Sequence, residues 1–135
     1  MKCLALLVFY IYTIVWGWGM RYIVHVDNSR FFRKMMKMFL SELGLESEGF
    51  DMGEDALNAV ASGDVSCVIT GLELPDMKGE TLISRLIAVA PRAMTIIVVT
   101  SSGDDEERVK ALEVMGVKAT IQKAGNWKEK LREHF

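Results

Sequence analysis

Five short segments, most of them apolar, divide this chain at fairly regular intervals. They cover residues 22–26, 46–50, 65–70, 95–100 and 117–122, and as a group they are rich in Val and Ile. Between them lie longer segments in which apolar residues recur at helical spacing. Because strands that alternate with helices form βαβ units, the pattern predicts a parallel sheet with helices on both faces.

Signals at the ends of the predicted helices support this division. Ser29 is a good N-cap for the first helix, and Gly44 is a good C-terminal stop for it. The acidic run at 104–107 places negative charge in the first turn of the helix after the fourth strand, where the helix dipole favours it. Gly116 closes the same helix.

Several polar or unusual residues fall at the carboxyl ends of the predicted strands. They are Asp27, Gly71, Thr100 and Lys123. In open α/β sheets, functional groups gather at these ends. The sequence therefore predicts a single site assembled from distant parts of the chain.

Four segments carry a set of signatures in a characteristic order. They are a strand and helix start at 21–35, a strand and loop at 65–79 with Pro75 and Gly79, a strand at 95–101 that ends in hydroxyl residues, and a strand at 117–123 that ends in lysine. Over residues 21–135 the chain resembles the receiver domains of response regulators. The resemblance implies a doubly wound, flavodoxin-like α/β domain at 20–135, with five parallel strands in the order 2-1-3-4-5.

The resemblance also implies where a phosphorylation site would lie. In the family, an Asp after the third strand accepts a phosphoryl group, and it holds Mg²⁺ together with an acidic pair after the first strand. The matching positions here are Gly71 for the acceptor and Asp27 and Asn28 for the pair. Glycine has no side chain that could attack phosphorus, and Asn28 removes a further negative charge. We therefore expect no catalysis, no cofactor and weak or absent Mg²⁺ binding, unless Glu73 turns inward beside Asp27.

The positions that would sense phosphorylation are altered as well. In the family a Thr or Ser senses the phosphoryl group, and the matching residue is Thr100. An aromatic residue usually swings inward with it, but that position is Thr120 here. Ala124 stands where the family usually has proline, often after a cis bond. Because a non-proline cis bond costs about 2.5–4 kcal/mol, we expect the Lys123–Ala124 bond to be trans.

Lys123 matches the lysine that pairs with the phosphoryl group in the family. Without that group it needs another anion, because a buried lysine with no partner is costly. Asp27 and Glu73 are the two candidates. We favour Asp27 because it lies at a rigid strand end, and interpret Glu73 as a solvated loop residue.

His25 is a conceivable alternative phosphoacceptor. It lies two residues before Asp27, about 6.6 Å down the strand and within the sheet layer. We favour a core histidine with satisfied hydrogen bonds over an acceptor.

Composition narrows the remaining possibilities. A chain of 135 residues with 50% hydrophobic residues is the size of one domain with a normal core. The net charge of −2 argues against nucleic acid held by bulk electrostatics. Cys3 and Cys67 show no zinc spacing and are not expected to pair, and we expect Cys67 to fill core space.

An apolar head precedes the receiver-like domain at 1–19. Residues 3–20 carry no charge, and as a helix they would span about 27 Å, which is marginal for a hydrocarbon core of about 30 Å. Three interpretations stand: an over-extended start with translation beginning at Met20, a membrane anchor, or a signal peptide. The first two both place the domain in the cytoplasm, and we favour them over a signal peptide.

Cations recur at helical spacing in the first predicted helix, at Arg30, Arg33, Lys34 and Lys37. A solvated face is the simplest interpretation. The stripe could also bind an acidic partner, or anionic lipid if the head is an anchor.

Three functions fit these observations. The favoured one is a phosphorylation-independent module that binds a signalling protein. The binding face would be the one that receivers use for partners: the fourth helix, which follows the fourth strand, the fifth strand, and the fifth helix, which follows that strand. The second is a phosphorelay receiver with a displaced acceptor. The third is a domain that binds a small anion beside Gly71, with Lys123 and Thr100 as contacts.

Overall fold

A five-stranded parallel sheet forms the centre of the domain. The computed structural model describes residues 22–90, 93–102 and 105–135. Its strands are β1 (Tyr22–Val26), β2 (Ser47–Phe50), β3 (Val65–Thr70), β4 (Thr95–Thr100) and β5 (Ala119–Gln122). Their order in the sheet is β2-β1-β3-β4-β5, and every pairing is parallel. The predicted flavodoxin-like fold and strand order are confirmed.

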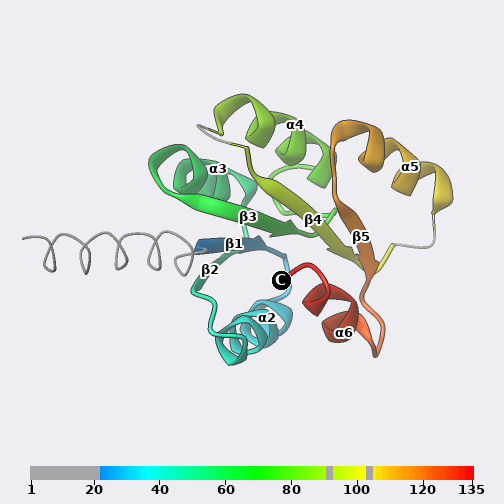
Figure 1. Cartoon of the computed structure of the whole chain (residues 1–135). Helices are drawn as coiled ribbons and strands as arrows, with labels where there is room; N and C mark the ends of the chain where they lie inside the picture. Colours follow the sequence, from blue (N-terminus) through cyan, green and yellow to red (C-terminus); the bar gives the residue numbers. More distant parts are fainter. Residues whose placement is uncertain (1–21, 91–92, 103–104) are drawn as a thin grey trace, which may run out of the picture.

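Helices cover both faces of this sheet (Figure 1). They are α2 (Arg30–Glu42), α3 (Gly53–Ser62), α4 (Gly79–Val89), α5 (Glu106–Met115) and α6 (Trp127–Arg132). Figure 1 shows α3, α4 and α5 on one face and α2 and α6 on the other. The predicted double winding is therefore present.

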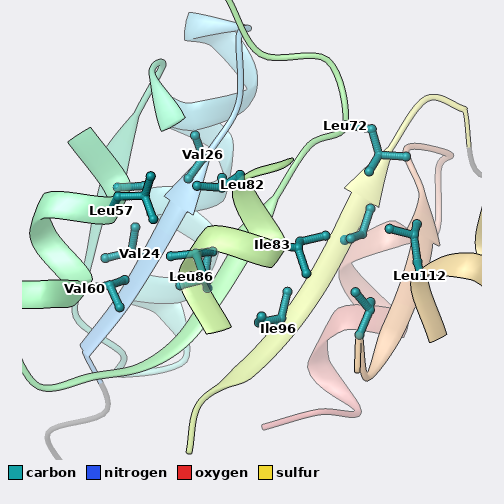
Figure 2. Packing of buried hydrophobic residues seen from close by; sticks show 14 residues of the cluster. Val24, Val26, Leu57, Val60, Leu72, Leu82, Ile83, Leu86, Ile96 and Leu112 are labelled. Atoms are coloured by element: carbon teal, nitrogen blue, oxygen red, sulfur yellow. The ribbon is translucent and has the colours of Figure 1, made fainter. Parts of the chain in front are cut away.

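The sheet separates two hydrophobic clusters, because successive side chains of a strand point to opposite faces. Val24 and Val26 of β1 belong to the cluster that α3, α4 and α5 cover, and Figure 2 shows them beside residues of α3 and α4. Ile23 points the other way and joins the cluster beneath α2 and α6, which includes Phe39 and the buried Cys67. The predicted core position of Cys67 is confirmed.

The helix ends follow the local sequence signals. Ser29 Oγ accepts a hydrogen bond from Phe32 N at 3.2 Å and caps α2. Gly44 and Gly116 follow α2 and α5 with φ angles of 75° and 105°, which favour glycine. Asp105 caps α5 by accepting from Arg108 N at 3.1 Å.

The start of α3 is capped from a distant loop. Its N-cap residue, Met52, makes no side-chain cap hydrogen bond. Instead, Asp76 of the β3–α4 loop accepts from Gly53 N at 2.8 Å through Oδ1 and from Glu54 N at 3.0 Å through Oδ2. Two of the backbone N–H groups that a helix start leaves free are thus satisfied across 22 or more residues of chain.

The apolar head at 1–19 and the boundary at Met20 lie outside the described residues. Within the described part of the chain, no helix combines the length and the apolar character that a membrane span requires.

Candidate functional site at the carboxyl edge of the sheet

The carboxyl ends of β1, β3, β4 and β5 bring together the residues that the sequence points to. Asp27, Gly71 and Lys123 directly follow β1, β3 and β5, and Thr100 ends β4. Backbone hydrogen bonds join these ends: Gly71 N donates to Val26 O at 2.9 Å, and Lys123 N donates to Thr100 O at 2.8 Å. The predicted convergence of distant segments is confirmed.

Asp27 and Lys123 form an ion pair at the centre of the site. Lys123 Nζ lies 2.6 Å from Asp27 Oδ2, and the aspartate side chain is only 6% exposed. The other carboxylate oxygen, Oδ1, accepts from Ser29 N at 2.8 Å. Arg33 Nη1 donates to the Asp27 backbone carbonyl at 2.7 Å. The predicted pairing of Lys123 with Asp27 is confirmed.

Phe32 holds the Lys123 ammonium group from a second side. Lys123 Nζ lies 4.2 Å from the centroid of the Phe32 ring, within the range of a cation–π interaction. Phe32 itself is buried and packs against Trp127 with ring centroids 4.9 Å apart. The lysine is therefore fixed between a carboxylate and an aromatic face.

Gly71 lies directly beside the Asp27 carboxylate. A Cβ atom at Gly71 would lie 3.3 Å from Asp27 Oδ2 and 3.7 Å from Val26 O. A carboxylate added at 71 would thus meet a carboxylate already present. Two like charges at this distance resist joint ionisation unless a cation lies between them.

Glu73 points away from the site centre, contrary to the alternative in which it turns inward. Its side chain is 53% exposed, and it pairs with Lys78 at 3.1 Å and with Arg108 at 3.2 Å. These partners, with the Lys78 hydrogen bond as the first cause, hold the pKa of Glu73 below its usual value. The interpretation of Glu73 as an exposed loop residue agrees with this position. The side chain is in addition held by the two cations.

The hydroxyl residues are tied to local backbone. Thr100 is buried, and its Oγ1 accepts from Ser102 N at 3.1 Å. Thr70 Oγ1 donates to Gly71 O at 2.8 Å. Thr120 is half-buried, with no hydrogen-bond partner at Oγ1.

Two further positions complete the comparison with the sequence-based expectations. Asn28 is exposed. The Lys123–Ala124 bond is trans, as expected.

His25 lies beneath the site, buried under α2. It is 2% exposed, and neither ring nitrogen has a hydrogen-bond partner. Burial, followed by the nearby charge of Lys37, lowers its pKa to about 4. The prediction of a core histidine is confirmed, but the prediction that its hydrogen bonds are satisfied is wrong.

Gly49 explains how the ring fits. It pairs with His25 across β1 and β2, and a Cβ atom there would lie 2.4 Å from His25 Cε1. The ring thus occupies room that any other residue at 49 would fill.

A small cavity lies beside His25 and Asp27. Its volume is about 10 Å³, and its walls include His25, Asp27, Phe32, Met36 and Gly71. That volume corresponds to about one water molecule. No group of three or more His, Cys, Asp or Glu side chains within the described ranges is placed to hold a metal ion.

Arg108 and Glu80 form a cluster that the sequence pattern does not single out. Arg108 Nε and Nη2 donate to the two carboxylate oxygens of Glu80 at 2.7 and 2.9 Å. The guanidinium hydrogen bond to Glu80 lowers the pKa of that carboxyl group, and the same contact raises the pKa of Arg108. The contact joins residues 28 positions apart, so no local signal in the sequence reveals it.

The comparison with known families agrees with the fold. The model of the response regulator receiver domain matches residues 23–134. The chain belongs to this family. The family is one of signalling modules, and the matched range includes Asp27, Gly71, Thr100 and Lys123.

Two curated relatives are transcriptional regulators. The chain is 32% identical over 96 residues to the transcriptional regulatory protein GltR of Pseudomonas aeruginosa, covering 70% of this chain and 39% of GltR. It is 26% identical over 91 residues to the transcriptional regulatory protein SrrA of Staphylococcus aureus, covering 67% of this chain and 37% of SrrA. This chain therefore matches about two-fifths of the length of these relatives.

Solved receiver domains resemble the domain closely in three dimensions. The signal receiver domain of an HD domain-containing protein from Pseudomonas fluorescens is 26% identical with a TM-score of 0.74, and the match covers 84% of this chain and 90% of that one. A CheY-like receiver domain protein from Methanospirillum hungatei is 25% identical with a TM-score of 0.75, and the match covers 85% and 90%.

Proposed function

We propose that this chain is a phosphorylation-independent receiver-like module that binds another signalling protein. The observation that carries the proposal is Gly71, which follows β3 where the resemblance expects the phosphoacceptor. Glycine offers no nucleophile. The cation that would pair with a phosphoryl group, Lys123, is already 2.6 Å from Asp27.

The proposed absence of strong Mg²⁺ binding rests on the same residues. Mg²⁺ prefers several hard oxygen ligands in octahedral geometry. Asp27 supplies one carboxylate, but one of its oxygens faces Lys123 and the other accepts from Ser29 N. Asn28 is neutral and exposed, and Glu73 is directed toward Lys78 and Arg108. This donor set fits a tightly held divalent ion poorly.

For the binding surface we propose the face formed by α5, β5 and α6. β5 is at the edge of the sheet, between the two helices. Val114 on α5 is 89% exposed, the most exposed of the large apolar side chains in the described part of the chain. An edge strand offers unpaired backbone groups to a protein partner, and Val114 adds an apolar contact beside it. We place the module in the cytoplasm, as expected for a domain related to transcriptional regulatory proteins.

The first test is chemical. The purified protein is incubated with Mg²⁺ and a small phosphodonor, and its intact mass is measured. We expect no gain of a phosphoryl group. A stoichiometric, base-labile gain of one phosphoryl group in the unaltered chain would overturn the proposal.

Two variants make the first test quantitative. Gly71→Asp restores a nucleophile beside Asp27, and Gly71→Asp with Asn28→Asp also restores the acidic pair. We expect little phosphorylation of the single variant and more of the double variant, because the added carboxylate improves Mg²⁺ binding and the bound cation screens the negative charges. A single variant as reactive as the double variant would show that Asn28 does not weaken the site.

The second test concerns the surface. Val114→Glu should abolish co-purification of a partner that the unaltered chain retains from its native cells. Ile87→Glu on α4 is the matched control, because Ile87 is also exposed, at 53%, but lies outside the proposed face. The control variant should retain the partner. If Val114→Glu retains as much partner as Ile87→Glu does, the α5–β5–α6 face is excluded.

The two other functions find less support in the geometry. A small anion would have to displace Asp27 from Lys123, and the adjoining cavity has a volume of only about 10 Å³. A displaced acceptor at His25 would require a residue that is 2% exposed to meet a phosphodonor.

A further inference from the structure

The sheet contacts of α5 are unusual among the helices of this domain. α5 buries one side chain, Leu112, with Met115 partly buried against the same cluster, whereas α2 buries four side chains and α3 and α4 bury three each. The hydrophobic contribution to stability grows with the apolar area that is buried, so it is smaller for α5 than for the other three helices. Other contacts must therefore contribute substantially to the position of α5.

Arg108 supplies such contacts from the first turn of α5. Its guanidinium group binds Glu80 through two parallel hydrogen bonds of 2.7 and 2.9 Å. Its Nη1 and Nη2 atoms also donate to Glu73 Oε1, each at 3.2 Å. The side chains of Arg108 and Glu80 are 22% and 34% exposed, so the bidentate pair is partly shielded from solvent.

The two carboxylates belong to the segment that starts at Gly71. Glu73 is two residues past Gly71, and Glu80 is in the first turn of α4. Figure 1 shows α4 and α5 as neighbours on the same face of the sheet. Arg108 therefore joins the start of α5 to the loop that carries the acceptor position.

That segment is a firm attachment point. Gly79 N donates to Leu72 O at 2.7 Å, and a Cβ atom at Gly79 would lie 2.7 Å from Gly71 O. Lys78 also pairs with Glu73 at 3.1 Å, so this carboxylate is held by two cations. A guanidinium group bound to such a segment can restrain the helix that carries it.

We propose that Arg108 acts as a clasp that fixes the N-terminal turn of α5 against the loop after β3 and the start of α4. The clasp sets the position of α5 without any phosphoryl group at the site. This inference rests on the proposed function, because it explains how the α5–β5–α6 face keeps one arrangement when the site does not cycle.

Isolated surface ion pairs contribute little, but this cluster differs from them. Bidentate arginine–carboxylate geometry and membership in a network are the circumstances in which ion pairs do contribute. The Arg85–Glu54 pair provides an internal comparison. It joins α4 to α3, its side chains are 47% and 52% exposed, and it involves no residue of α5.

The test is hydrogen–deuterium exchange of the whole chain, without any partner present. Arg108→Gln keeps much of the side-chain length and removes the charge. We expect amides of α5 to exchange about fivefold to tenfold faster, because the helix opens locally more often. Amides of β1 and α2 should be unchanged, and the matched control Arg85→Gln should leave α5 unchanged.

A second variant, Glu80→Gln, removes the same ion pair from its other side. It should accelerate hydrogen exchange of the α5 amides by a similar factor. Exchange of α5 within twofold of the unaltered chain in both variants would overturn the proposal. Equal acceleration throughout the chain would also overturn it, because Arg108 would then support overall stability and not the position of α5. Since no partner or phosphodonor is used, failure here is distinct from failure of the proposed function.

Discussion

The helices α2 and α5 both begin beside the candidate site, but different forces hold them to the sheet. α2 buries Phe32, Met36, Phe39 and Leu40, and two of these contact the Trp127 ring at centroid distances of 4.9 and 5.6 Å. α5 buries Leu112, with Met115 partly buried beside it, and is joined to α4 and the preceding loop by the ion pairs of Arg108. Hydrophobic burial holds α2 to the sheet. Ion pairs make a larger contribution to the position of α5 than to that of α2.

The difference indicates which side of the site can respond to its surroundings. Apolar contacts are not weakened by charge screening, whereas ion pairs with partly exposed groups weaken as ionic strength rises. We therefore expect α2 to act as a fixed wall. α5 is the element whose position depends on a few side chains.

The largest effect that we expect tests the α2 side of this comparison through His25. Its pKa is about 4 in the folded protein against an ordinary value of 6.5. Above pH 6.5 the ring is neutral in both states. Between pH 6.5 and 4 the unfolded chain binds a proton that the folded protein does not. The free energy of unfolding therefore decreases as the pH is lowered through this range, by about 3 kcal/mol in total.

Urea unfolding at pH 7, 6 and 5 measures this loss. His25→Leu should remove most of the slope in this range, because the carboxyl groups with lowered pKa values titrate at lower pH. The charges that act on the ring are those of Lys37 and Arg33, which lower its pKa, and Asp27, which raises it. An unchanged slope in the variant would show that His25 is not the source.

A smaller effect is expected at the Asp27–Lys123 ion pair, which joins the ends of β1 and β5. Lys123→Met and Asp27→Asn should each lower the free energy of unfolding, and the double variant should lose less than the sum of the two. We expect a coupling of about 1–2 kcal/mol, because the Lys123 side chain is 22% exposed and the Asp27 side chain 6%. Denaturant unfolding of all four proteins gives the value, and strictly additive losses would contradict the pairing.

The smallest expected effects are at the two N-caps. Ser29→Ala and Asp105→Ala each remove one cap hydrogen bond, and each should cost about 0.5–2 kcal/mol. The comparison predicts different consequences. Loss of the Ser29 cap should appear in global unfolding, since α2 is part of the core, and loss of the Asp105 cap should appear as faster hydrogen exchange within α5.

If Asp105→Ala lowered global stability as much as Ser29→Ala and left exchange in α5 unchanged, the distinction between the helices would not hold. Ser41→Ala in the last turn of α2 is a suitable control. Its side chain is exposed and contributes no N-cap hydrogen bond.

The amino-acid sequence by itself determined the elements and the meeting point of the main site residues. Apolar runs and helix-end signals such as Ser29, Gly44 and Gly116 act within a few residues, so they can be read without knowledge of the fold. Because parallel strands end at the same edge of a sheet, the sequence also predicted that Asp27 and Lys123 meet there.

The tertiary structure decided which distant polar groups find one another. Asp76 caps α3 from another loop, and Glu73 turns to Lys78 and Arg108 and not toward the site. The His25 ring lies against Gly49, and neither of its nitrogens has a hydrogen-bond partner. Such outcomes depend on loop paths and side-chain directions to within an ångström, and periodicity along the chain carries no information at that scale.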